Sequence, residues 1–151
     1  MFKKIFKKIP SSLYTVASLS ALAAINYSII NNSFVFIAIL VLLCHELGHY
    51  FIAKKEGASP SLPIFFPLPF VAIAITRIKN LSLKSKKKVS ISGPIFGFIT
   101  ALILFLLNIV FSYTSSIMLL SLMFGELVFN YIGTDGKKYR HAKKELSLCI
   151  S

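Results

Sequence analysis

Long apolar runs constrain this chain more than any other feature of its sequence. Residues 11–30 carry no charged side chain, and as a helix they are long enough to cross the hydrocarbon of a bilayer, about 30 Å thick. Because a cleaved signal peptide has a shorter apolar core of about 7–15 residues, we interpret this run as a retained helix. Further helices are expected over about 34–53, 89–111 and 117–132. The sequence predicts an all-α polytopic membrane protein with about four transmembrane helices, forming a single domain over residues 1–151.

The placement of positive charge indicates the orientation of these helices. All 17 Lys and Arg residues fall in the segments 3–8, 54–88 and 137–144, which lie on one side of the expected crossings. Basic loops are retained in the cytoplasm, so both termini are expected there, and the residues after 136 form a basic tail. The lysines lack an interleaved aromatic platform, which argues against a nucleic-acid partner for the net charge of +12. Usage rich in Lys, Ile, Asn and Phe indicates an AT-rich bacterial genome and hence a bacterial plasma membrane.

The segment between the second and third expected helices has a different character. Four prolines between residues 60 and 69 exclude a continuous helix through its first half. Residues 70–78 (FVAIAITRI) are β-branched and aromatic, and the prolines upstream suit an edge strand. We therefore expect a small β-hairpin or edge-strand region here, with an amphipathic loop as the alternative.

The second expected helix carries His45, Glu46 and His49 in the sequence H-E-L-G-H. Unpaired ionisable groups at membrane depth cost at least a few kcal/mol each, which makes them candidates for function. Positions i and i+4 lie about 40° apart on a helix, so both imidazoles can bind one Zn²⁺. Glu46 can then accept a proton from the zinc-bound water as it attacks a carbonyl. The sequence predicts one zinc ion per chain with Glu46 as the catalytic base; two histidines capping the helix end near the headgroups are the alternative.

A catalytic zinc needs a third protein ligand, and three residues are candidates. Asp135 is favoured, because it lies at the expected cytoplasmic end of the fourth helix between Gly133 and Gly136, which permit a non-helical turn. Glu126 lies about two and a half turns deeper and can ligate the metal or form hydrogen bonds within the bundle. His141 is the third candidate.

Two further features belong to the later helices. The sequence S-G-P-I-F-G opens the third expected helix, where Gly93 and Gly97 form a surface for close helix packing and Pro94 is tolerated in the first turns. Asn130 can donate to a substrate carbonyl or a developing oxyanion, or it can bond a neighbouring helix.

The H-E-L-G-H, S-G-P-I-F-G and N-x-x-x-x-D-G sequences resemble those of the site-2 protease family of intramembrane zinc metalloproteases, over about residues 34–140. The resemblance implies the following roles: catalytic base, Glu46; zinc ligands, His45, His49 and Asp135; substrate-binding residues, Asn130, Gly93 and Pro94. It also implies that residues 63–78 form a membrane-associated β region to whose edge an extended substrate adds. The family has a longer stretch with a proline before D-G, and this departure weakens the role of Asn130 more than that of Asp135.

The expected function is hydrolysis of peptide bonds in membrane-embedded or membrane-bound substrates near the cytoplasmic face. The expected partners are a membrane protein or peptide and the lipid bilayer; the sequence does not fix the oligomeric state. Two other functions stay open. A zinc-binding membrane partner or immunity protein would not need the base Glu46, and a small transporter subunit would be expected to have repeated halves with broken helices, which this sequence lacks.

Overall fold

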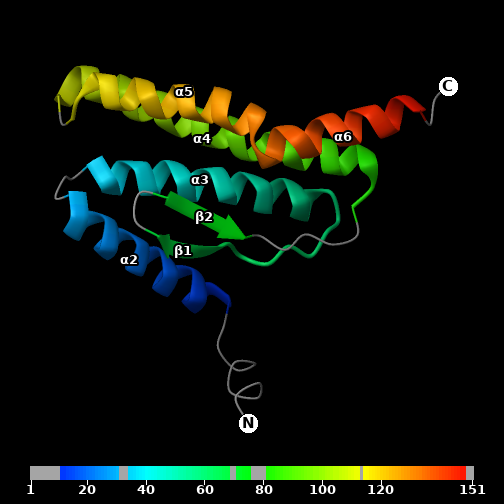
Figure 1. The fold of residues 1–151 in the computed structure, drawn as a ribbon, viewed down its shortest axis with the longest axis horizontal. Helices are drawn as coiled ribbons and strands as arrows, with labels where there is room; N and C mark the ends of the chain where they lie inside the picture. Colours follow the sequence, from blue (N-terminus) through cyan, green and yellow to red (C-terminus); the bar gives the residue numbers. More distant parts are fainter. Residues whose placement is uncertain (1–10, 31–33, 69–70, 76–80, 113, 149–151) are drawn as a thin grey trace, which may run out of the picture.

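The computed structural model describes residues 11–30, 34–68, 71–75, 81–112 and 114–148, and its elements carry the labels of Figure 1. The described chain is mostly helical, as the sequence predicts. In chain order the elements are α2 (Ser11–Ile30), α3 (Phe34–Lys55), β1 (Ile64–Leu68), β2 (Val71–Ile75), α4 (Leu83–Phe111), α5 (Ser116–Ile132) and α6 (Thr134–Leu148).

Helix α4 organises the fold, because it packs against α3 on one side and against α5 and α6 on the other. Figure 1 shows α4, α5 and α6 as one layer, α3 as the next, and the two strands beneath α3. Helix α2 packs against β1 at the far side of the sheet. The chain therefore places α3 between the sheet and the remaining helices.

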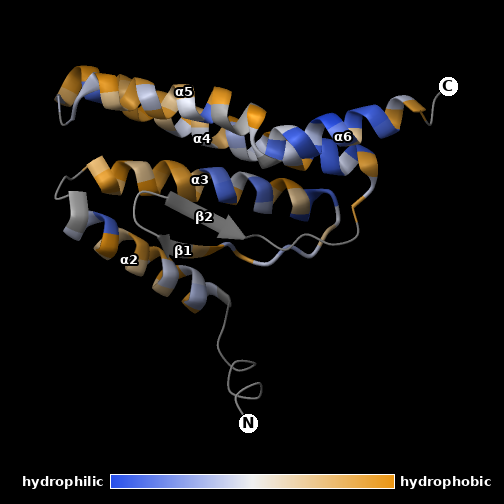
Figure 2. Cartoon of the chain, in the orientation of Figure 1, coloured by the Kyte–Doolittle hydropathy of each residue, from blue (hydrophilic) through white to orange (hydrophobic). Residues whose placement is uncertain are grey.

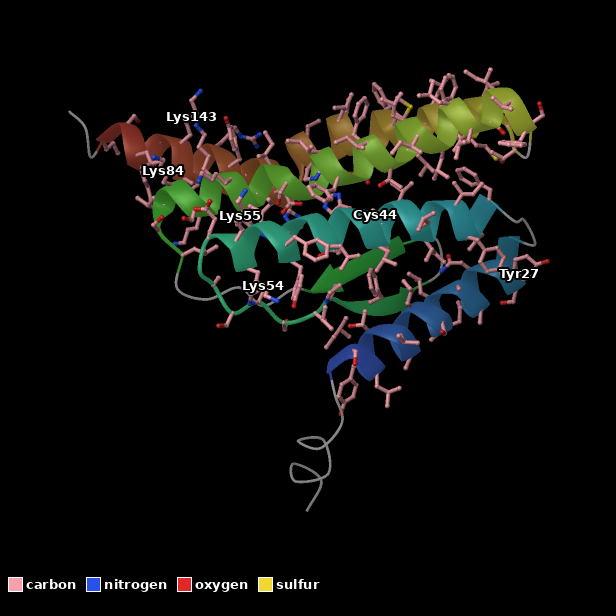
Figure 3. All side chains as sticks on the ribbon, turned by 180° about the vertical axis from the view of Figure 1, so that it is seen from behind. Tyr27, Cys44, Lys54, Lys55, Lys84 and Lys143 are labelled. Carbon is pink, nitrogen blue, oxygen red and sulfur yellow. The ribbon has the colours of Figure 1, made fainter. Side chains whose placement is uncertain are left out.

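Two of the described helices, α3 and α4, are long and apolar enough to cross a membrane. The second half of α4 and the start of α5 expose large apolar side chains, such as Val110 at 73% and Ile117 at 78%. Figure 2 shows this apolar end opposite a hydrophilic end formed by α6, the start of α4 and the end of α3. Lys54, Lys55, Lys84 and Lys143 lie at the hydrophilic end (Figure 3). Four membrane crossings stay a prediction.

The structure corrects the sequence-based bounds in the basic segments. Helix α4 begins at Leu83 instead of about residue 89, because Ser82 caps it by accepting a hydrogen bond from the Ser85 N–H at 3.2 Å. The lysines that follow are straight-chain residues with good helix propensity. Pro94 consequently lies in the interior of α4 and not in its first turns. The same propensity accounts for α6, which occupies what the sequence suggests to be a basic tail.

Strands β1 and β2 pair antiparallel, with Ile64 opposite Ile75 and Leu68 opposite Val71. This sheet falls in the region where the sequence predicts a hairpin or an edge strand, although residues 69–70 and 76–80 lie outside the described part. Two hydroxyl groups of helix α2 form hydrogen bonds with the backbone at the outer side of β1. Thr15 Oγ1 donates to the Pro63 carbonyl at 2.7 Å, and the Phe65 N–H donates to Ser18 Oγ at 3.1 Å.

A tight turn joins α4 to α5 and sets the two helices antiparallel. Ser112 ends α4 in the left-handed region, with φ of 49°, and its N–H donates to the Asn108 carbonyl at 2.8 Å. The buried Asn108 side chain accepts from the Thr114 N–H at 2.9 Å and donates to Ser116 Oγ at 3.2 Å. This turn returns α5 along α4, so that Glu126 and the start of α6 lie opposite α3.

Candidate metal centre

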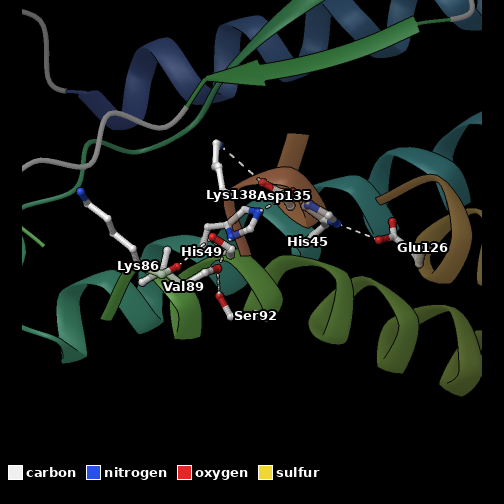
Figure 4. Close-up of polar contacts among 9 residues, drawn as sticks. His45, His49, Lys86, Val89, Ser92, Glu126, Asp135 and Lys138 are labelled. Atoms are coloured by element: carbon white, nitrogen blue, oxygen red, sulfur yellow. Dashed lines mark hydrogen bonds and ion pairs between the residues drawn. The ribbon is translucent and has the colours of Figure 1, made fainter. Parts of the chain in front are cut away.

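Three buried side chains from two helices converge beside α4 (Figure 4). His45 and His49 come from α3, one turn apart, and Asp135 comes from the first turn of α6. Asp135 Oδ2 lies 3.3 Å from His45 Nε2 and 3.1 Å from His49 Nε2. One ligand atom from each residue lies within 4.8 Å of the other two, which is the spacing that a single metal ion needs.

The second nitrogen of each imidazole has its own partner. His49 Nδ1 lies 2.7 Å from the Val89 carbonyl oxygen, and because a carbonyl can only accept, His49 donates its proton there. His45 Nδ1 lies 2.7 Å from Glu126 Oε2, which as a carboxylate also accepts. Metal-binding histidines commonly donate their other N–H in this way, which fixes the tautomer and the ring orientation.

This arrangement tests whether the site fits a metal. With the protons on Nδ1, the Nε2 lone pairs of His45 and His49 both face Asp135 Oδ2, a negatively charged oxygen. Three electron-rich atoms at these distances repel one another unless a cation or added protons lie among them. Two imidazole nitrogens and one carboxylate oxygen are a donor set of catalytic zinc sites, which keep a fourth position open. The residues therefore fit Zn²⁺.

Gly93 of α4 lies directly against the Nε2 atoms of His45 and His49. A Cβ atom at this position would lie 2.3 Å from His49 Nε2 and 2.7 Å from His45 Nε2. Gly48 of α3 similarly permits close approach of the helices, since its Cβ would lie 2.8 Å from the Ser92 carbonyl oxygen. The sequence suggests helix packing for Gly93; the structure adds that its missing side chain keeps space beside the two histidines.

Asp135 lies in a setting that favours its charged form. Lys138 adds positive charge, with its Nζ 3.5 Å from Asp135 Oδ1. The first turn of α6 also places the carboxylate at the positive end of a helix dipole.

The other candidate residues lie in different places. Glu126 bonds the far nitrogen of His45 and is not in the donor cluster, and exposed His141 lies 3.4 Å from Glu145 on α6. Glu46 follows His45 in α3 and is half-buried, and Pro94 follows Gly93 in α4 and is half-buried as well. The side chain of Asn130 lies outside the described part, so its expected role is not tested.

Comparisons with known proteins agree with this geometry. The model of peptidase family M50 matches residues 33–146. The probable zinc metalloprotease EGY2 of Arabidopsis thaliana, a chloroplastic protein, is 43% identical over 74 residues, which cover 46% of this chain and 13% of the relative. The zinc metalloprotease MJ0392 of Methanocaldococcus jannaschii is 30% identical over 105 residues, which cover 66% of this chain and 30% of the relative. The chain thus spans less than a third of either relative, and no solved structure gives a significant match.

Proposed function

Because the chain belongs to peptidase family M50, the site-2 protease family, we propose that it is an intramembrane zinc metalloprotease. Its proposed reaction is the hydrolysis of peptide bonds in membrane-embedded or membrane-bound substrates, near the cytoplasmic face. The observation that carries this proposal is the convergence of His45, His49 and Asp135 on one point beside an apolar helix. Glu46, next to the first of these ligands, supplies the base that a purely structural zinc site does not need.

The residues divide the chemistry among them. His45, His49 and Asp135 would hold the zinc ion, which when bound lowers the pKa of a water molecule towards neutrality and polarises a carbonyl group. Glu46 accepts a proton from the attacking water and passes it to the leaving nitrogen, as a general base and then a general acid. Gly93 leaves room for the scissile segment of the substrate to approach the ligands closely.

The proposal also covers the substrate path and the orientation in the membrane. An extended substrate segment adds to the edge of the β1–β2 sheet, where main-chain hydrogen bonds hold it open for attack, with Asn130 and Pro94 as further contacts. His49 precedes Lys55 by about 9 Å of helix, so the site lies near the basic end of the molecule. With basic ends in the cytoplasm, both termini lie there and cleavage occurs on that side of a bacterial plasma membrane.

The test combines zinc content with cleavage. The detergent-purified protein is incubated with a library of single-pass transmembrane segments, and products are identified by mass spectrometry. Wild type is expected to bind one zinc ion per chain and to cleave the substrates. Glu46→Gln is expected to bind zinc but to cleave at least about 100-fold more slowly. Glu145→Gln, an exposed change on α6, serves as the control and keeps both properties.

Two outcomes would contradict the proposal. Cleavage by Glu46→Gln at the wild-type rate would show that Glu46 is not the base. A wild-type protein that binds zinc but cleaves no member of the library would favour the non-catalytic zinc-binding partner, which the sequence leaves open.

A further inference from the structure

A short contact joins Glu126 of α5 to His45 of α3 across 81 residues of sequence. The distance between Glu126 Oε2 and His45 Nδ1 is 2.7 Å, and the two side chains are only 12% and 6% exposed. Glu126 is thus a largely buried carboxylate held within the helix bundle, and it contacts a residue of the metal centre. Figure 4 shows it on the side of His45 that faces away from Asp135.

Gly97 of α4 makes this contact possible. A Cβ atom at Gly97 would lie 2.5 Å from Glu126 Cδ and within 2.8 Å of both carboxylate oxygens. The Glu126 carboxylate therefore rests against bare backbone of α4 while it reaches His45 on α3. Any side chain at position 97 would displace the carboxylate or separate the helices.

The two histidines differ in the partner that orients them. His49 donates to the carbonyl of Val89, which also accepts a hydrogen bond from Ser92 Oγ at 2.7 Å. His45 instead donates to a carboxylate, and charge-assisted hydrogen bonds of this kind are about twice as strong as neutral ones. A carboxylate at Nδ1 also makes the opposite nitrogen a better metal ligand. Glu126 thus both aims the His45 ring and strengthens its Nε2 donor.

We infer that Glu126 is a positioning residue. Its carboxylate packs against the bare backbone at Gly97 and holds His45 in the metal-binding orientation. This inference rests on the proposed function, because it concerns the affinity of the same metal centre. Glu126 approaches Nδ1 of His45, whereas Asp135 faces Nε2, so Glu126 supports a ligand and does not serve as one.

The test is the zinc dissociation constant of the detergent-purified protein, measured by competition with a chromogenic chelator. Glu126→Ala is expected to keep one zinc ion per chain at saturation, with affinity weakened about 10- to 100-fold. Glu126→Gln should weaken it less, because its amide oxygen still accepts from Nδ1–H. Asp135→Ala should lose the zinc ion, and Glu145→Gln, which removes an exposed carboxylate from α6, should match wild type.

A second variant tests the packing of Glu126 against Gly97 without removing the carboxylate. Gly97→Ala should weaken zinc binding as Glu126→Ala does, and the double variant should be little worse than Glu126→Ala alone, because both changes break one contact. Strictly additive losses would contradict the shared contact.

The outcomes separate this inference from the proposed function. If wild type binds one zinc ion and Glu126→Ala binds it equally tightly, the inference is wrong and the metalloprotease proposal stands. If Glu126→Ala loses the zinc ion while Asp135→Ala keeps it, Glu126 is the ligand and the inference is also wrong. If wild type binds no zinc at all, the proposed function fails, and this inference fails with it.

Discussion

Asp135 Oδ2 lies 3.1 Å from His49 Nε2, although 86 residues separate the two along the chain. The contact depends on the Asn108 turn, which returns α5 along α4, and on the start of α6 directly after α5. It also brings an anionic oxygen against nitrogen lone pairs, an arrangement that a bound cation would stabilise. The site therefore couples the position of α6 to metal binding.

This coupling predicts that metal stabilises the protein through Asp135. Removing zinc from wild type with a chelator should lower its thermal midpoint in detergent, since free zinc at about 100 times its dissociation constant adds about 2.7 kcal/mol. Asp135→Asn, which keeps the size of the side chain, should show a much smaller zinc-dependent shift. A scanning fluorescence melt with and without zinc measures both, and an equal shift in the two proteins would contradict the proposed ligand.

Gly93→Ala should abolish zinc binding while leaving most of the fold in place. The added Cβ would lie 2.3 Å from His49 Nε2 and would force at least one imidazole away from Asp135. Atomic absorption of the purified variant should find well under one zinc ion per chain. Ile91→Ala, at an exposed position on the same helix, should bind zinc normally, whereas full zinc occupancy in Gly93→Ala would refute the steric argument.

The sequence predicts the local part of this site better than its tertiary part. His45 and His49 could be assigned to one face of one helix because an i, i+4 spacing has this consequence in any helix. The partner of each Nδ1 could not be predicted, because the Val89 carbonyl and Glu126 come from helices whose rotation depends on packing. The sequence accordingly leaves Glu126 open as a ligand or a bundle contact, and in the structure its Oε2 lies 2.7 Å from His45 Nδ1.

The basic segments show the same limit in the fold. Lysines within residues 84–88 and 137–144 suggest loops, because basic residues are expected in the segments outside the membrane-spanning helices. Both segments are nevertheless helical, because lysine has good helix propensity and Ser82 supplies a cap. Ser82 is a capping residue that marks the start of α4 in the sequence, whereas the packing of α6 on α4 has no sequence signal of its own.

The double variant Thr15→Val/Ser18→Ala should loosen α2 from the sheet. It would leave the Pro63 carbonyl and the Phe65 N–H without these hydroxyl partners, at a cost of about 1–3 kcal/mol for each buried group left unsatisfied. Hydrogen exchange should show faster exchange of the Phe65 amide than in wild type. Ser28→Ala removes a hydroxyl that donates to the Ile25 carbonyl of its own helix, and it should leave that rate unchanged. Equal protection of Phe65 in all three proteins would contradict the closing role of α2.

Glu56 links the end of α3 to the start of α4 at the hydrophilic end of the molecule. Lys88 Nζ donates to its Oε1 at 2.6 Å, and Ser85 Oγ donates to its Oε2 at 2.6 Å. The hydrogen bond from Lys88, followed by that from Ser85, lowers the pKa of the Glu56 carboxyl below its ordinary value of 4.5. The contact is solvent-accessible, so its contribution to stability is small, but its pH dependence has a definite sign.

A carboxyl whose pKa is lower in the folded state stabilises the fold above its unfolded pKa and loses this contribution as the pH falls through the folded pKa. Wild type should therefore melt at a higher temperature than Glu56→Gln at pH 7, and the difference should shrink as the pH falls below about 4.5. Comparing the two proteins at each pH cancels the titration of the metal centre, which they share. Adding Lys88→Gln to both proteins removes the main cause of the lowered pKa. It should therefore narrow the difference between their melting temperatures already at pH 7. A difference that stays constant from pH 7 to pH 3 would show that Glu56 does not contribute as a paired carboxylate.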